Sequence, residues 1–197
     1  KRFAAILMDA IVFSGRRVVV ALGINAMGER MILGIREGDT ENAEICKDLL
    51  QTLLDRELDV SDPILFVIDG GKGMRRAIRA VFGEKHPVQR CTIHKARNIE
   101  SYLPQKYHAE FKHRWFKLHR LEKYSEAKLE YERLRHWLSR IATEAVTSLD
   151  EAKQETMTVV RLGTGRYLRR SLHSTNMIEG LFDKVRMQTR RVKNWKK

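Results

Sequence analysis

The chain has 197 residues, a mass of 23.0 kDa, a formal net charge of +13 and a pI near 10.0. At this length we expect one domain with an insertion, or two small domains. Hydrophobic residues make up 43% and charged residues 32%, a globular balance that excludes a disordered chain. Two cysteines exclude a disulfide-rich scaffold, and no apolar stretch approaches the roughly 18 residues that a membrane span needs.

The positive charge is concentrated toward the end of the sequence. Residues 161–197 contain eleven Lys or Arg and only two acidic residues, Glu179 and Asp183. A net positive charge of this size favours a polyanionic partner, most simply nucleic acid. The chain opens on Lys1 without an initiator Met, and we expect it to be part of a longer protein.

The first half of the sequence alternates between strand and helix patterns. The elements that we predict are strands at 3–13, 16–24 and 29–36, a helix with an apolar face from Ile45 to Leu58, a strand at 63–69, a helix at 73–82 and a short strand at 87–91. Tight turns at Ser14–Gly15 and Asn25–Gly28 predict an antiparallel meander of the first three strands. Asp39 or Thr40 is the expected cap of the first helix.

This order of elements predicts an α/β fold with a ribonuclease-H-like mixed sheet. Three antiparallel strands are followed by parallel strands and flanking helices, and the first and fourth strands become neighbours. From 92 to 170 the alternation is lost and apolar residues recur at helical spacing, which predicts an all-helical insertion ending near Gly163–Gly165. The predicted organisation is a first core segment at 1–91, the insertion at 92–170, and a core helix with a basic tail at 171–197.

Two aspartates interrupt apolar runs that read as buried strands. Asp9 lies in the middle of the first strand, and Asp69 ends the fourth, just before Gly70–Gly71. An ionised carboxylate in such a place costs several kcal/mol unless it is compensated, and a divalent cation does this well. Because the first and fourth strands are expected to be neighbours, the two aspartates should lie side by side and form part of a metal site.

A third carboxylate, Glu179, lies in the first turn of a predicted helix at 176–191. Three carboxylates on separate elements can hold two Mg²⁺ or Mn²⁺ ions roughly 3.5–4 Å apart and activate an oxygen for phosphoryl transfer. One face of this helix carries acidic and basic side chains at i, i+4, i+7 and i+11, namely Glu179, Asp183, Arg186 and Arg190. We expect the two arginines to bind DNA phosphates beside the metals, because guanidinium groups bind two oxygens at once.

Alternatives remain open at several of these positions. Glu179 follows Asn176 at the spacing of a helix capping box, in which a glutamate only accepts backbone hydrogen bonds. Asp183 is the rival third ligand. Cys91 and His94 are either half of a zinc site, which lacks a second pair of ligands, or a plain core pair, or His94 is a structural or phosphate-contacting group near the metals. The Trp115 and Trp137 stripes are either helical core or base-stacking surfaces.

The combination of these motifs resembles the catalytic region of Mutator-type bacterial insertion-sequence transposases. The resemblance is carried by Asp9 in a strand, Val67–Gly70, Cys91–His94, a helical stretch and Ser174–Glu179, and it covers essentially the whole chain. The segment Gly38–Asn42 also resembles the family sequence that leads into its first helix.

The resemblance implies an Asp-Asp-Glu transposase that cleaves transposon ends and transfers the exposed 3′-hydroxyl to target DNA. Asp9, Asp69 and Glu179 would be the catalytic triad and would bind two Mg²⁺ or Mn²⁺ ions. Arg186 fills the basic position that recurs seven residues after the glutamate in such transposases. From the residues themselves we also expect Arg190, His94 and Lys72 to contact DNA, while the roles of Cys91, His94 and Asn176 stay undefined. The resemblance further implies a homo-oligomer on double-stranded DNA in the bacterial cytoplasm, with nucleoid association. A nuclease that cuts without joining, and a non-catalytic DNA-binding derivative, are the alternatives.

Overall fold

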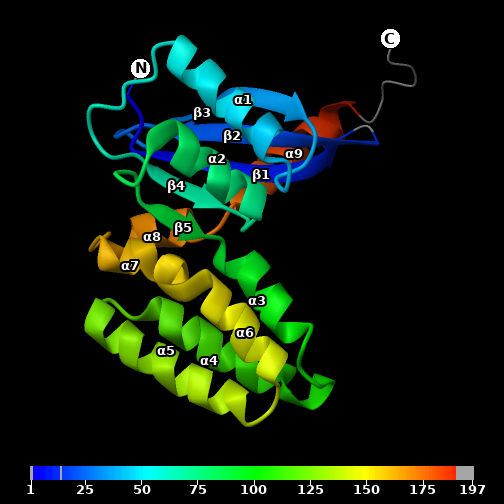
Figure 1. Cartoon of the computed structure of the whole chain (residues 1–197), viewed down its shortest axis with the longest axis vertical. Coiled ribbons are helices and arrows are strands. Elements are labelled where there is room, and N and C mark those ends of the chain that lie inside the picture. Colours follow the sequence, from blue (N-terminus) through cyan, green and yellow to red (C-terminus); the bar gives the residue numbers. More distant parts are fainter. Residues whose placement is uncertain (1, 14, 190–197) are drawn as a thin grey trace.

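A five-stranded mixed sheet organises the computed structural model of this chain, which describes residues 2–13 and 15–189 (Figure 1). The strand order is β3-β2-β1-β4-β5. The strands are β1 (Ala5–Phe13), β2 (Arg16–Ile24), β3 (Arg30–Glu37), β4 (Leu65–Ile68) and β5 (Val88–Arg90). All five strands agree with the sequence prediction within a few residues.

The first three strands form the predicted antiparallel meander. β1 pairs with β2 and β2 with β3, both antiparallel. The tight turns contain Gly15 and Gly28, whose φ angles of 76° and 80° lie in the left-handed region. Glycine adopts that conformation without the steric cost that a Cβ brings, so the turn chemistry seen in the sequence sets the meander.

β4 pairs with β1 in parallel, as predicted. Its register places Met8 opposite Ile68. The residue that follows each member of this pair is an aspartate, Asp9 on β1 and Asp69 directly after β4. The structure thus brings these two residues to the same level on neighbouring strands.

Two apolar layers cover the two faces of the sheet. Side chains alternate along a strand, so Ile6 and Met8 of β1 face the layer under α1 (Ala43–Asp55) and α2 (Lys72–Phe82). Leu7 and Ile11 of β1 face the other layer, which continues into the helical region. Asp9 follows the same alternation and lies on the side of Leu7 and Ile11.

The predicted cap of the first helix was wrong. The side chain of Asn42, and not of Asp39 or Thr40, accepts hydrogen bonds from the backbone amides of Glu44 and Ile45. Asp39 instead pairs with Arg17 of β2, and the Thr40 hydroxyl is donated to Asp69. Both residues had suitable side chains for a cap, but their contacts with the sheet and the β4–α2 loop placed them outside the helix.

Residues after β5 are helical up to α9, as predicted. The helices are α3 (Thr92–Glu100), α4 (His108–Arg120), α5 (Tyr124–Ser139), α6 (Thr143–Ala152), α7 (Thr158–Arg161) and α8 (Arg166–Leu172), with short 3₁₀ turns at Gln105–Tyr107 and Lys153–Met157. Trp115 is fully buried, and Trp137 packs half-buried against the same layer. Trp115 is therefore helical core. The domain boundaries predicted at 91/92 and 170/171 stay predictions, because one apolar layer runs through sheet and helices alike.

A buried ionic cluster joins the sheet to the helical region. Arg90 of β5 and Lys95 of α3 both contact Glu151 of α6, with N–O distances of 3.2 and 2.6 Å. The two cationic side chains are 6% and 2% exposed. Because each buried cation depends on the same carboxylate, Glu151 fixes how α6 sits against the edge of the sheet.

The last described helix returns to the first strand. Helix α9 (Asn176–Thr189) packs along β1 (Figure 1). There the rings of Phe182 and Phe13 meet edge to face, with their centroids 5.7 Å apart. Among the described residues, no helix is both long and apolar enough to cross a membrane.

Candidate metal centre

Asp9 is a buried carboxylate with an unsatisfied oxygen. It is 3% exposed, and its Oδ1 accepts the backbone N–H of Ala10 at 2.9 Å. Its Oδ2 is buried and has no hydrogen-bond partner among the described residues. Burial raises the pKa of Asp9 to about 6, and the neighbouring Thr175 hydroxyl and His94 only partly offset this effect. A carboxylate in this state is stabilised by any cation that reaches it.

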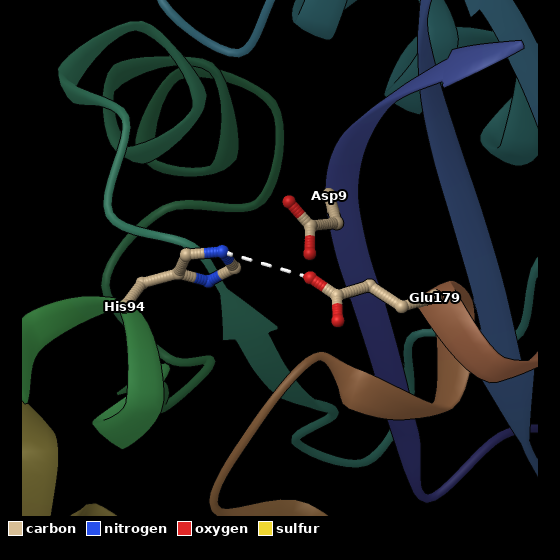
Figure 2. Close-up of side chains that lie close together, drawn as sticks. All are labelled: Asp9, His94 and Glu179. Carbon is tan, nitrogen blue, oxygen red and sulfur yellow. Dashed lines mark ion pairs between the residues drawn. The ribbon is translucent and has the colours of Figure 1, made fainter. Parts of the chain in front are cut away.

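Two further side chains converge on Asp9 from different elements. His94 lies in the first turn of α3 and Glu179 in the first turn of α9. One ligand atom from each of Asp9, His94 and Glu179 lies within 4.8 Å of the others. Figure 2 shows the three side chains pointing toward one another, with His94 Nε2 at 3.9 Å from Glu179 Oε1. This trio, the Asp9 cluster, is a group that can hold a metal ion.

The His94 ring is held from behind by two polar neighbours. Its Nδ1 lies 3.5 Å from the Thr175 hydroxyl, and its side chain hydrogen-bonds to Cys91. The contact with Cys91, with Asp9 and Asp69 adding to it, raises the pKa of His94 to about 9 against the opposing effect of burial. Burial would raise the pKa of the Cys91 thiol, but the His94 side chain outweighs it and the pKa is lowered.

Asp69 lies close to the Asp9 cluster but outside it. Its Oδ2 accepts the Thr40 hydroxyl and its Oδ1 accepts the Gly71 N–H, both at 2.9 Å. Its charge nevertheless contributes to the raised pKa of Asp9. The structure therefore places Asp69 directly after the neighbouring strand, as predicted, with its carboxylate accepting hydrogen bonds from the loops that precede α1 and α2.

Known proteins with similar sequences identify the family of this chain. The model of the family described as "Transposase, Mutator family" matches residues 1–195. The chain belongs to this family. The Rhizobium meliloti (strain 1021) transposase for insertion sequence element ISRM5 is 32% identical over 184 residues, covering 92% of this chain and 44% of that protein. The Mycolicibacterium smegmatis transposase for element IS6120 is 26% identical over 173 residues, covering 88% of this chain and 52% of that protein.

A third relative is the Staphylococcus aureus transposase for element IS256 in transposon Tn4001. It is 28% identical over 169 residues, which cover 85% of this chain and 42% of that protein. The chain spans about half the length of these curated relatives or less. The resemblance to Mutator-type transposases inferred from the sequence is thus confirmed at the level of the family.

The residues expected to contact DNA in this Mutator-family chain lie in different settings. Arg186 donates to the backbone carbonyl of Val12 at 2.7 Å and pairs with Asp183 at 2.8 Å, so it also ties α9 to β1. Lys72 is exposed at the start of α2, beside a cavity of about 490 Å³ that Arg90 also lines. Arg190 lies outside the described residues.

The two alternatives for Glu179 have different structural standing. Helix α9 begins at Asn176, so the residue in the capping position before it is Thr175 rather than Asn176. Glu179 is directed at His94, while Asp183 is 64% exposed and paired with Arg186. The geometry therefore favours Glu179 over Asp183 as a ligand, and Asn176 is an exposed residue at the start of the helix.

Sequence reasoning missed two threonines that support the acidic residues. Thr175 is fully buried and faces both His94 and Asp9, and Thr40 is 4% exposed and donates to Asp69. A signal for Thr175 was present, since it directly precedes the Asn-x-x-Glu motif. No pattern in the sequence marked Thr40 as a partner of a residue 29 positions later.

Proposed function

We propose that this chain is the catalytic region of an insertion-sequence transposase that cleaves a DNA strand at a transposon end and joins it to target DNA. The observation that carries the proposal is the unsatisfied oxygen of buried Asp9, facing Glu179 with Asp69 on the neighbouring strand. The proposal takes the mixed sheet to be ribonuclease-H-like, and the strand order β3-β2-β1-β4-β5 supports it. In such a fold the first and fourth strands are neighbours, which places Asp9 beside Asp69 as an Asp-Asp-Glu set of ligands requires.

The donors present fit divalent cations. Carboxylate oxygens suit Mg²⁺ and Mn²⁺, and an unpaired buried carboxylate is the group that gains most from a positive charge. Asp9, Asp69 and Glu179 would hold two such ions. When bound, the ions would activate an attacking oxygen and stabilise the leaving one. Burial of Asp9 and the hydrogen bonds to Asp69 would fix the carboxylates before DNA arrives.

Basic side chains would hold the DNA backbone next to these acids. Lys72 at the start of α2 and Arg186 on α9 are the described candidates, and Arg190 is a further one by sequence. Binding should weaken steeply with salt, with a slope of about −0.9 for each phosphate contact, because counterions are released from DNA. Fluorescence anisotropy titrations of DNA binding at several salt concentrations test these contacts.

We further propose that the protein acts as a homo-oligomer on double-stranded DNA in the bacterial cytoplasm, associated with the nucleoid.

The catalytic proposal is tested by a pair of conservative variants on one helix. Glu179→Gln removes a proposed ligand charge, and Asp183→Asn removes a charge one turn away that is paired with Arg186. Strand transfer and its reversal on a branched oligonucleotide should fall by at least about 10³-fold in Glu179→Gln and less than about threefold in Asp183→Asn. The reverse ranking would make Asp183 the ligand.

Two other outcomes bear on the reaction itself. Nicked product without any joined product would indicate a nuclease rather than a transposase. Full activity of Asp9→Asn, with the circular dichroism spectrum unchanged, would overturn the assignment of the site. Circular dichroism of each variant separates loss of chemistry from loss of fold.

A further inference from the structure

The side chain of His94 lies among the proposed carboxylate ligands, but the proposed Asp-Asp-Glu metal site gives it no role. It is the nitrogen member of the Asp9 cluster, whereas Asp69, the remaining proposed carboxylate ligand, is not in that cluster. We infer that His94 Nε2 is a direct metal ligand, so that one of the two cation positions is formed by Asp9, His94 and Glu179. The inference deepens the proposed function and rests on it, since it takes this cluster to be a metal-binding part of that site.

The distances suit a common ion. Ligand atoms at about 2.1 Å from one cation lie about 3 to 4.2 Å from each other, depending on the angle between them. His94 Nε2 and Glu179 Oε1 are 3.9 Å apart, and all three ligand atoms lie within 4.8 Å. Shifts of well under 1 Å would bring them onto one cation. Figure 2 shows that the ring edge carrying Nε2 faces the two carboxylates.

The second nitrogen of the ring is placed as in other metal-binding histidines. A ligating imidazole usually hydrogen-bonds through its other nitrogen, which fixes the ring and its tautomer. Here Nδ1 faces the Thr175 hydroxyl at 3.5 Å, and Thr175 is fully buried. Thr175 and the hydrogen bond to Cys91 therefore position the ring and leave Nε2 directed at the site. The first turn of α3 fixes the backbone from which the ring projects.

Buried Asp9 supplies an independent reason for a cation at this point. The residue is 3% exposed, and its Oδ2 is buried without a hydrogen-bond partner in the described part of the chain, although the Thr175 hydroxyl lies beside the carboxylate. Such a group carries a penalty of several kcal/mol that a metal–oxygen bond removes. A His–Glu ion pair alone would leave this oxygen unsatisfied.

A nitrogen ligand changes which cation the position prefers. Mg²⁺ keeps waters and oxygen ligands, whereas imidazole suits Mn²⁺ and later first-row metals. The Asp9 cluster should therefore select Mn²⁺ over Mg²⁺. The second position, between Asp9 and Asp69, would have only oxygen ligands and no such preference. The two cation positions of the site are thus chemically unequal.

Pulsed electron paramagnetic resonance on the purified protein with Mn²⁺ alone tests the inference without an activity readout. Bound Mn²⁺ should show coupling to an imidazole ¹⁴N, and labelling histidine with ¹⁵N should change that signal. His94→Gln should abolish the coupling and weaken Mn²⁺ binding at least about tenfold, with Mg²⁺ binding changed less than about threefold. His113→Gln, at an exposed histidine of α4, is the matched control and should change neither.

The outcomes separate this inference from the function on which it rests. Mn²⁺ that binds in an Asp9-dependent way without ¹⁴N coupling would overturn the role of His94 and leave the transposase proposal intact. Coupling that persists in His94→Gln would assign the ligand to another histidine and also overturn it. Absence of Mn²⁺ binding in the unaltered protein would overturn both. If His94→Gln does not fold, His94→Asn replaces it, and Thr175→Val should lower Mn²⁺ affinity more than Mg²⁺ affinity.

Discussion

Replacing Asp9 by Asn should make the metal-free protein more stable while it removes the metal site. The pKa of Asp9 rises from 3.8 to about 6 on folding, chiefly because of burial. At about 1.4 kcal/mol for each pH unit, the ionised carboxylate costs the folded state about 3 kcal/mol. Asn has the same shape and no charge, so the variant should recover about 1 to 3 kcal/mol at pH 8, the lower value allowing for an imperfectly bonded amide.

The sign and the pH range follow from the direction of that shift. Between pH 3.8 and about 6 the folded state holds a proton that the unfolded chain has lost, so stability falls as the pH rises through this range. The penalty is complete above about pH 6 and below about 1 kcal/mol at pH 4. The advantage of Asp9→Asn should therefore be largest at neutral and alkaline pH and nearly absent at pH 4.

Urea unfolding monitored by circular dichroism, with EDTA or with Mn²⁺, measures both effects. A cation at one hundred times its dissociation constant should stabilise the unaltered protein by about 2.7 kcal/mol and leave Asp9→Asn unchanged. Asp69→Asn is the matched control, because Asp69 already accepts two hydrogen bonds and should gain no stability on losing its charge. If Asp9→Asn were less stable than the unaltered protein in EDTA at pH 8, the burial penalty derived for Asp9 would be wrong.

Three further predictions concern the scaffold and are checked by the same unfolding experiment. Glu151→Ala leaves the buried cations of Arg90 and Lys95 without their carboxylate and should lower the free energy of unfolding by about 3 kcal/mol. Asp150→Ala breaks an exposed ion pair and should lower it by less than about 1 kcal/mol. Equal losses of stability in the two variants would contradict this prediction. Gly73→Ala drives a methyl group into the backbone carbonyl oxygen of Glu41 and should cost about 1 to 3 kcal/mol. Gly180→Ala meets nothing within 4 Å and should gain up to about 1 kcal/mol. Buried His86 accepts a backbone N–H through Nδ1, and burial lowers its pKa. Its contribution to stability is therefore complete above about pH 6.5 and is lost as the pH falls toward the folded-state pKa. His86→Gln should reduce this loss of stability at low pH, and an unchanged pH profile would refute the prediction.

The sheet was predictable because local signals and the global arrangement agree. Glycine turns, apolar runs and the change from strand to helix periodicity each point to the same order of elements. The neighbouring positions of Asp9 and Asp69 followed from that order, since a parallel pairing of the first and fourth strands leaves few registers that bury the apolar runs of both strands. The family resemblance then indicated Glu179, which periodicity alone left open between a ligand and a cap.

The details of the site could not be predicted, because they depend on which of several suitable groups is nearest in space. Asp39, Thr40 and Asn42 are all good helix caps, and only the docking of α1 against β3 and α2 decides for Asn42. His94 was expected near the acids, yet its place beside Glu179 depends on how α3 and α9 pack. Contacts of this kind join residues 81 or more positions apart and leave no periodic trace.

The attachment of α9 to the sheet has a consequence for when the site exists at all. This helix contributes Glu179, and Phe182 and Arg186 fasten it to the strand that carries Asp9. Detaching it breaks far fewer interactions than melting the sheet, so the molecule can lose one liganding group through a local opening. Amide hydrogen exchange along this segment, rather than the melting temperature of the whole chain, therefore measures how much of the time the liganding groups are assembled.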